Sequence, residues 1–177
     1  MRFLLFISLA FGLLAGCSPK VVPASNSKSD LYFWLPQLRD STQKNSYHVA
    51  LSKDKATISG IWIVKRIDQS WRGTMVNEFG LKMFDFTCTA NACELKNAVA
   101  MMNKWYIKKT IAGDVQFILE VDNPIYKTGQ AARRSWSNDT LTIAYKNEKI
   151  LQRLASGEMV MYNKKRNLTY SFKKMDK

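Results

Sequence analysis

Apolar and polar residues alternate along the middle of the chain, and this alternation predicts β-strands. The first clear run extends from Thr57 to Ile67 and is rich in β-branched residues. Trp71 to Asn77, Leu81 to Thr89 and Glu94 to Val99 follow, each after a short turn. Because strands joined by short turns pair with each other, the four runs predict an antiparallel meander.

The apolar spacing becomes helical after these strands. Val99 to Val121 is predicted to be helical, and Gly113-Asp114 is expected to break it, with Asp114 capping a second short helix through Leu119. Residues 36–55, which contain His48, are expected to form a helix or loop. Residues 123–139 are expected to form a long loop.

Strands return in the last third of the chain. Short alternating runs begin at Leu141, Ile150, Met159 and Leu168. Strands, then helices, then strands is the order of an antiparallel α+β domain. Several strands are apolar on both faces, so one face should contact a core and the other a helix, a partner or an apolar ligand.

The N-terminus has the layout of a secretory segment. Met1-Arg2 is positively charged, Phe3 to Leu14 is apolar, and the small residues Ala15-Gly16 lead directly into Cys17. This resembles a bacterial lipobox, which implies cleavage before Cys17 and lipidation of its thiol. The alternative is a transmembrane helix, but the apolar run is shorter than the ~20 residues that a span needs.

The lipobox defines the expected domain organisation. Residues 1–16 form a lipoprotein signal peptide, residues 17–30 a lipidated flexible tether rich in Pro, Ser and Lys, and residues 31–177 a single domain. Serine at position 18, rather than aspartate, implies the outer membrane, with the domain facing the periplasm. The apolar cluster 31–35 is expected to dock on the core, with a lipid contact as its alternative.

The chain is strongly basic, with 27 Lys and Arg against 14 Asp and Glu, a net charge of +13. Loss of residues 1–16 removes one basic residue, Arg2, and leaves 26 − 14 = +12. This charge favours anionic partners. For a lipid-anchored protein outside the cytoplasm these are a membrane surface or an acidic protein, and not nucleic acid. Arg133-Arg134 and 164–166 are candidate contact patches or simply solubilising charges.

Two cysteines remain after Cys17. Cys88 and Cys93 are close in sequence and would face an oxidising envelope, which favours a disulfide over two free thiols. A metal site is not expected, because His48 is the only histidine and the chain has no C-x-x-C pair.

Catalytic patterns are not evident. His48 has no neighbouring nucleophile motif, and the chain has no Gly-rich phosphate loop. We therefore expect a binding protein without a cofactor rather than an enzyme. The five tryptophans and eight methionines suit an adaptable apolar cavity, although an ordinary packed core explains them as well.

Residues 59–119 carry a family resemblance. The segments SGIWIVKR and SWRGTMVNEFGLKMFDF, a hairpin, and GDVQFIL resemble the LolA/LolB-like lipoprotein-localisation family, in particular its outer-membrane receptor branch. The resemblance implies a curved antiparallel sheet, or incomplete β-barrel, covered by helices. It also implies an apolar cavity for acyl chains, and lipoprotein transfer from a periplasmic carrier into the outer membrane.

The resemblance also supplies candidate site residues. A membrane-contact loop would contain Phe79 and Leu81. The acyl-chain ligands would be Trp62, Val64, Trp71, Met75, Phe84, Phe86, Met101 and Trp105. A second hypothesis is a structural or interaction lipoprotein, an accessory subunit of an envelope assembly, in which these residues belong to a fully packed core.

Overall fold

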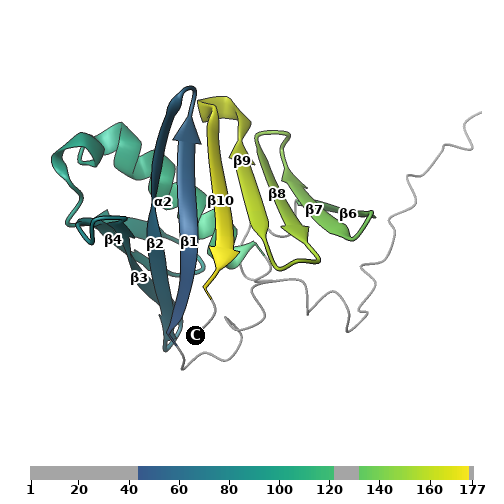
Figure 1. Ribbon diagram of the computed structural model, residues 1–177. Coiled ribbons are helices and arrows are strands. Elements are labelled where there is room, and N and C mark those ends of the chain that lie inside the picture. The colour runs from purple at the N-terminus through teal and green to yellow at the C-terminus, as the bar shows by residue number, and fades with distance from the viewer. Residues whose placement is uncertain (1–43, 122–131, 176–177) are drawn as a thin grey trace, which may run out of the picture.

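The computed structural model describes residues 44–121 and 132–175, which contain one ten-stranded antiparallel sheet and one α-helix (Figure 1). The strand order is β5-β4-β3-β2-β1-β10-β9-β8-β7-β6. The first and last strands therefore pair at the centre of the sheet. The expected signal peptide, the tether, Cys17 and the apolar cluster 31–35 lie outside the described residues.

Two meanders make up the sheet. The first contains β1 (Asn45–Lys53), β2 (Ala56–Ile67), β3 (Ser70–Asn77), β4 (Lys82–Cys88) and β5 (Cys93–Lys96). The second contains β6 (Arg133–Ser137), β7 (Thr140–Tyr145), β8 (Lys149–Leu154), β9 (Met159–Asn163) and β10 (Leu168–Lys174). A 3₁₀ turn, η3 (Ala100–Met102), and the helix α2 (Trp105–Glu120) lie between the two meanders. A second 3₁₀ turn, η4 (Lys164–Arg166), connects β9 to β10.

The helix lies against one face of the sheet, here called the covered face, and the opposite face is called the outer face (Figure 1). Alternation along β1 shows the division, since Tyr47, Val49 and Leu51 are buried while His48 is exposed. Apolar side chains of the covered face and of α2 form one hydrophobic cluster. Burial of this apolar area is what drives the helix onto the sheet.

The expected α+β fold, with an incomplete barrel covered by helices, is wrong. Strands make up 57% and helical turns 18% of the described residues, and the sheet does not close into a barrel. Its edges in the described ranges are β5 and β6, and a single α-helix covers it there. The observed class is a mainly antiparallel-sheet fold.

Two segments expected to be helix or loop are strands instead. Within 36–55, β1 occupies the centre of the sheet, and within 123–139, the chain from Arg133 to Ser137 forms β6. Polar residues on the outer side of β1, and the lack of any buried residue along β6, obscure the apolar alternation that predicts strands. Pairing with β10 and β7 nevertheless fixes both segments.

The expected helix break at Gly113-Asp114 is also wrong. Helix α2 is continuous from Trp105 to Glu120, and Asp114 lies in its interior with no exposed surface. Aspartate is a poor residue for a helix interior because its side chain competes for backbone hydrogen bonds. Here the Asp114 carboxylate has partners on the sheet instead, so tertiary contacts override local preference.

Substitution of two glycines by alanine should change stability in opposite directions. A Cβ on Gly60 in β2 would lie 2.0 Å from the carbonyl oxygen of Val76, so Gly60→Ala forces neighbouring backbone apart and should lower the free energy of unfolding by about 2–3 kcal/mol. A Cβ on Gly113 meets only the Lys149 side chain at 3.7 Å. Gly113→Ala should therefore stabilise the helix by up to ~1 kcal/mol. Urea titration of both variants measures the two changes in the free energy of unfolding, and changes of the same sign would contradict the prediction.

Candidate functional site

The eight predicted acyl-binding residues fall into two groups. Six belong to the hydrophobic core and are at most 4% exposed, namely Trp62, Val64, Trp71, Met75, Phe84 and Phe86. The other two are solvent-exposed, Met101 at 62% and Trp105 at 73%. The structure therefore brings six of the candidates together on the covered face and leaves two outside the core.

Aromatic rings fill the centre of the covered face. The ring of Trp62 lies 5.0 Å from that of Phe172 and 5.3 Å from that of Phe86, measured between centroids. Phe117 and Ile118 of α2 are completely buried in the same cluster. With the helix in place, these side chains are buried against one another between α2 and the sheet.

A buried polar cluster holds α2 to the sheet. The Lys149 ammonium in β8 lies 2.8 Å from Asp114 Oδ1 and donates a hydrogen bond of 2.7 Å to the carbonyl of Gly113. Asn163 Nδ2 in β9 donates to both Asp114 oxygens at 2.9 and 3.0 Å. The Tyr170 hydroxyl in β10 donates to Oδ2 at 3.0 Å. One helix residue thus contacts three strands of the second meander.

Forming this cluster costs desolvation free energy, but once formed it fixes one position of α2 on the sheet. A buried charge is tolerated only when it is paired and its remaining lone pairs accept hydrogen bonds. Asp114 meets both conditions, and the cluster fixes the position of α2 along the strands more sharply than apolar contacts alone. Its partners come from distant parts of the chain, so local sequence pattern could not reveal them; the only signal is an aspartate within an apolar helical run.

Two buried tyrosines make the fold sensitive to alkaline pH. Burial raises the pKa of Tyr47, and burial together with the Asp114 carboxylate raises that of Tyr170. The stability that these raised pKa values contribute is fully present below the unfolded-state pKa near 10.0. It is lost as pH rises above that value, because ionisation of the tyrosines then favours the unfolded chain. The Tyr47 hydroxyl has no hydrogen-bond partner within the described residues. Tyr47→Phe should therefore raise stability at pH 7 by about 1 kcal/mol and weaken the alkaline loss, which thermal unfolding across pH 7–11 can measure.

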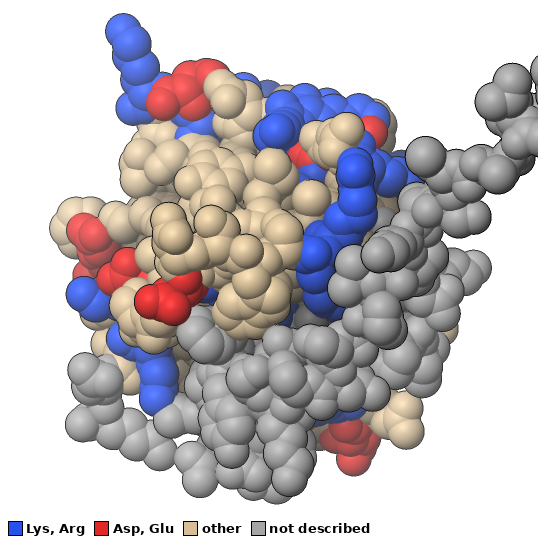
Figure 2. Space-filling view, turned by 90° about the vertical axis from the view of Figure 1, so that its right-hand side faces the viewer, with Lys and Arg blue, Asp and Glu red and all other residues tan. Residues whose placement is uncertain are grey.

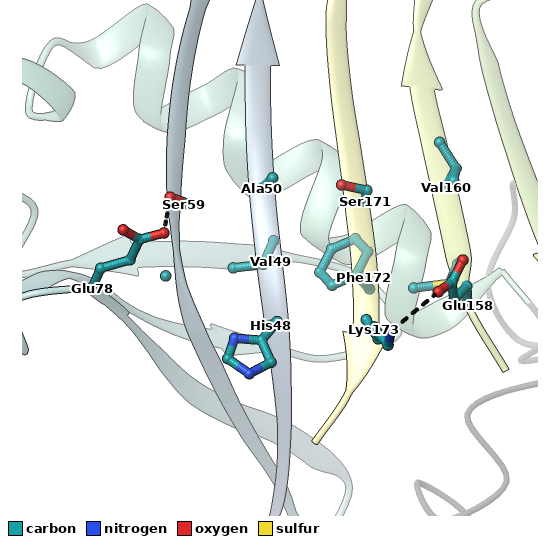
Figure 3. Close-up of a pocket in the computed structure, with 12 residues that line it drawn as sticks. His48, Val49, Ala50, Ser59, Glu78, Glu158, Val160, Ser171, Phe172 and Lys173 are labelled. Carbon is teal, nitrogen blue, oxygen red and sulfur yellow. Dashed lines mark hydrogen bonds and ion pairs between the residues drawn. The ribbon is translucent and has the colours of Figure 1, made fainter. Parts of the chain in front are cut away.

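A shallow pocket of about 330 Å³ lies on the outer face, across β2, β1, β10 and β9 (Figure 3). Small side chains, including Ala50 and Ser171, form part of its lining. Ionisable groups line it as well: Glu78 accepts a hydrogen bond from Ser59, and Lys173 lies 3.8 Å from Glu158. His48, the only histidine of the chain, also lines this outer pocket.

Two adjacent rows of residues across the outer face contain no charged side chain. The first row, from β6 to β2, consists of Ser135, Thr142, Gln152, Val160, Ser171, Ala50 and Ser59. The second, from β7 to β2, consists of Ala144, Ile150, Tyr162, Thr169, Ser52 and Thr57. We call these two rows the uncharged band. Figure 2, viewed from the side of β6 to β8, shows a broad area without charged side chains, with both basic and acidic side chains along its margins.

The β3–β4 and β4–β5 hairpins carry the remaining predicted residues. Phe79 and Leu81, the predicted membrane-contact residues, are 88% and 64% exposed in the β3–β4 turn. The predicted disulfide is confirmed: Cys88 and Cys93 are bonded and lie directly opposite each other in the β4–β5 ladder. The bridge closes the hairpin at the edge of the sheet.

The described residues contain neither a candidate metal site nor a candidate membrane-spanning helix. No three His, Cys, Asp or Glu side chains within 44–121 and 132–175 are grouped so that they could hold a metal ion. No helix in the same residues has the length and apolar character to cross a membrane. No protein-family model matches the chain, and no curated protein matches it.

Proposed function

We propose that this chain is a lipid-anchored envelope protein that works by binding a protein partner, with its own core fully packed. The observation that supports this most is the packing of α2 on the covered face, which leaves six of the eight predicted acyl-binding residues in the core. Membrane attachment rests on the lipobox at Cys17.

Magnitudes favour a packed core over an acyl cavity. Helix α2 buries six apolar side chains against the sheet, and at about 1.5–3 kcal/mol for each large one their burial contributes roughly 10 kcal/mol. An acyl chain of about sixteen carbons would gain about 12 kcal/mol on burial, at ~0.8 kcal/mol per CH₂. The free energy gained by burying an acyl chain would thus only about match the free energy lost by displacing the helix. Displacement would also separate Asp114 from Lys149, which adds a further unfavourable free energy.

The outer face is the surface that we assign to the partner. The uncharged band is built mainly from Ser, Thr and small apolar residues, and it crosses seven strands without a charge although the chain has 41 charged residues (27 + 14). Depletion of charge at the centre with ionisable groups at the rim is the composition of a protein–protein contact. The outer pocket is lined partly by this band, and Glu78, Glu158 and Lys173 supply its ionisable groups.

Site-specific photo-crosslinking tests the assignment. A photoreactive amino acid at position 171, in the outer pocket, should give one discrete protein adduct in cells that produce the full chain. The same group at Lys65, an exposed position on β2 outside the band, is the control and should not. Val160→Arg should abolish the adduct, because it introduces a charge into the band. Lipid adducts alone, or protein adducts of equal yield from both positions, would refute the proposal.

The second candidate is the acyl carrier implied by the LolA/LolB-like resemblance. The continuous apolar surface beneath α2 favours it, because displacing one helix would expose this surface. If so, Asp114→Asn should loosen the helix and increase uptake of a fluorescent fatty-acyl probe by the full chain. Unchanged, negligible uptake by both proteins would leave the interaction class as the better account.

A further inference from the structure

The start of α2 carries large apolar side chains that do not contribute to the core. Met101 in η3 is 62% exposed, Trp105 73% and Tyr106 46%. The rings of Trp105 and Tyr106 meet edge to face, with centroids 6.0 Å apart. The buried residues of the helix begin only at Ile111. Before Ile111, Ile107 packs against the core, whereas Trp105 and Tyr106 stay exposed to solvent.

Three lysines lie close to these apolar residues in the sequence. Lys104, Lys108 and Lys109 lie in the same segment, which contains no Asp or Glu from residue 95 to residue 113. The helix has no acidic residue in its first turn, although its dipole would favour one there. None of the three lysines forms an ion pair within the described residues. Among the residues that the structure describes, no acidic side chain pairs with this local positive charge.

We propose that this helix-start patch, formed by Met101, Lys104, Trp105, Tyr106 and Lys108, contacts an anionic lipid surface. Tryptophan and tyrosine favour the boundary between head groups and acyl chains, where the ring is apolar and its polar group stays wet. Lysine stems extend along apolar surface and place their charge among phosphates. The excess of positive charge is complementary to anionic head groups and would repel a second copy of this chain.

The patch lies beside the β3–β4 turn. The backbone N–H of Val99, just before η3, donates to the carbonyl of Met83 at 2.9 Å, which ties this segment to the start of β4. Figure 1 places the start of α2 at the left-hand end of the molecule, away from β6 to β8. Contact here would leave the second meander, with its part of the uncharged band, away from the lipid. The inference stands whether or not the outer face binds a partner.

Tryptophan quenching by brominated lipids tests the contact. The full chain is reconstituted into vesicles of brominated phosphatidylcholine, with or without phosphatidylglycerol. Quenching should increase with the anionic lipid, and Trp105→Phe should remove that increase. Trp136→Phe is the matched control, because Trp136 is also exposed, at 44%, but lies on the edge strand β6, so this variant should keep the increase.

Charge variants test the electrostatic part. Lys104→Gln with Lys108→Gln should lower the contact equilibrium constant about 25-fold, or about fivefold for each lysine. Lys53→Gln with Lys55→Gln, at the β1–β2 turn, makes the same change in net charge and should lower it less than twofold. Quenching that does not depend on Trp105 or on anionic lipid would overturn the proposal, as would a solution dimer that Trp105→Phe dissociates.

Discussion

Asp114→Ala should lower the free energy of unfolding by about 3–5 kcal/mol, because removing one member of a buried ion pair leaves the other charge without compensation. The side chain of Lys149 is only 19% exposed, and Asn163 and Tyr170 also lose their common acceptor. Whole small domains are stable by only about 5–15 kcal/mol, so the variant should be close to unfolding at 37 °C. Urea denaturation followed by circular dichroism measures the loss.

A double variant distinguishes ion-pair loss from general disruption of packing. Asp114→Leu with Lys149→Met replaces both charges by apolar groups, and such replacements of buried pairs are often neutral. The double variant should therefore be more stable than Asp114→Ala, while Lys149→Met alone should be less stable than the double. Equal losses in all three variants would show that the pair contributes nothing specific to holding α2.

Trp62→Ala should lower the free energy of unfolding by a similar amount, about 3–5 kcal/mol, because it removes a large side chain from the centre of a packed core. Trp62 is 2% exposed and lies within ring-contact distance of Tyr47, Phe86 and Phe172. The resulting cavity would be surrounded by residues from several strands that cannot easily collapse into it.

Trp105→Ala is the control for Trp62→Ala, since Trp105 is a predicted acyl ligand that the structure leaves exposed. We expect it to change stability by less than about 0.5 kcal/mol. A loss below about 1 kcal/mol for Trp62→Ala would contradict the packed core and indicate that Trp62 borders an open space.

The meander strands could be predicted from the sequence because their covered sides are apolar at every second position. Trp62 and Val64 in β2 and Phe84 and Phe86 in β4 provide that signal. Strand β1 has the same alternation in Tyr47, Val49 and Leu51, but the polar residues between them dilute it over the longer segment in which it lies. Strand β6 has no buried residue and depends on its pairing with β7, a contact that local pattern does not encode.

The features that could not be predicted from the sequence depend on contacts between residues far apart in the chain. The partners of Asp114 lie 35, 49 and 56 residues further along the chain, which no local window spans. The resemblance to a carrier family emphasised the apolar residues of the covered face as ligands, yet apolar residues on a strand look alike in a cavity and in a core. Only the position of α2 distinguishes the two, and the outer pocket became visible only when four strands were placed side by side.

Native mass spectrometry of the full chain purified from cells tests the packed core most directly. We predict that its measured mass equals that of the polypeptide plus its own covalent lipid on Cys17, and that an added fatty-acyl probe does not bind, either to the native chain or to Asp114→Asn. A non-covalently retained lipid or lipopeptide, or saturable probe uptake that Trp62→Ala abolishes, would contradict the account and establish an acyl-binding cavity beneath α2.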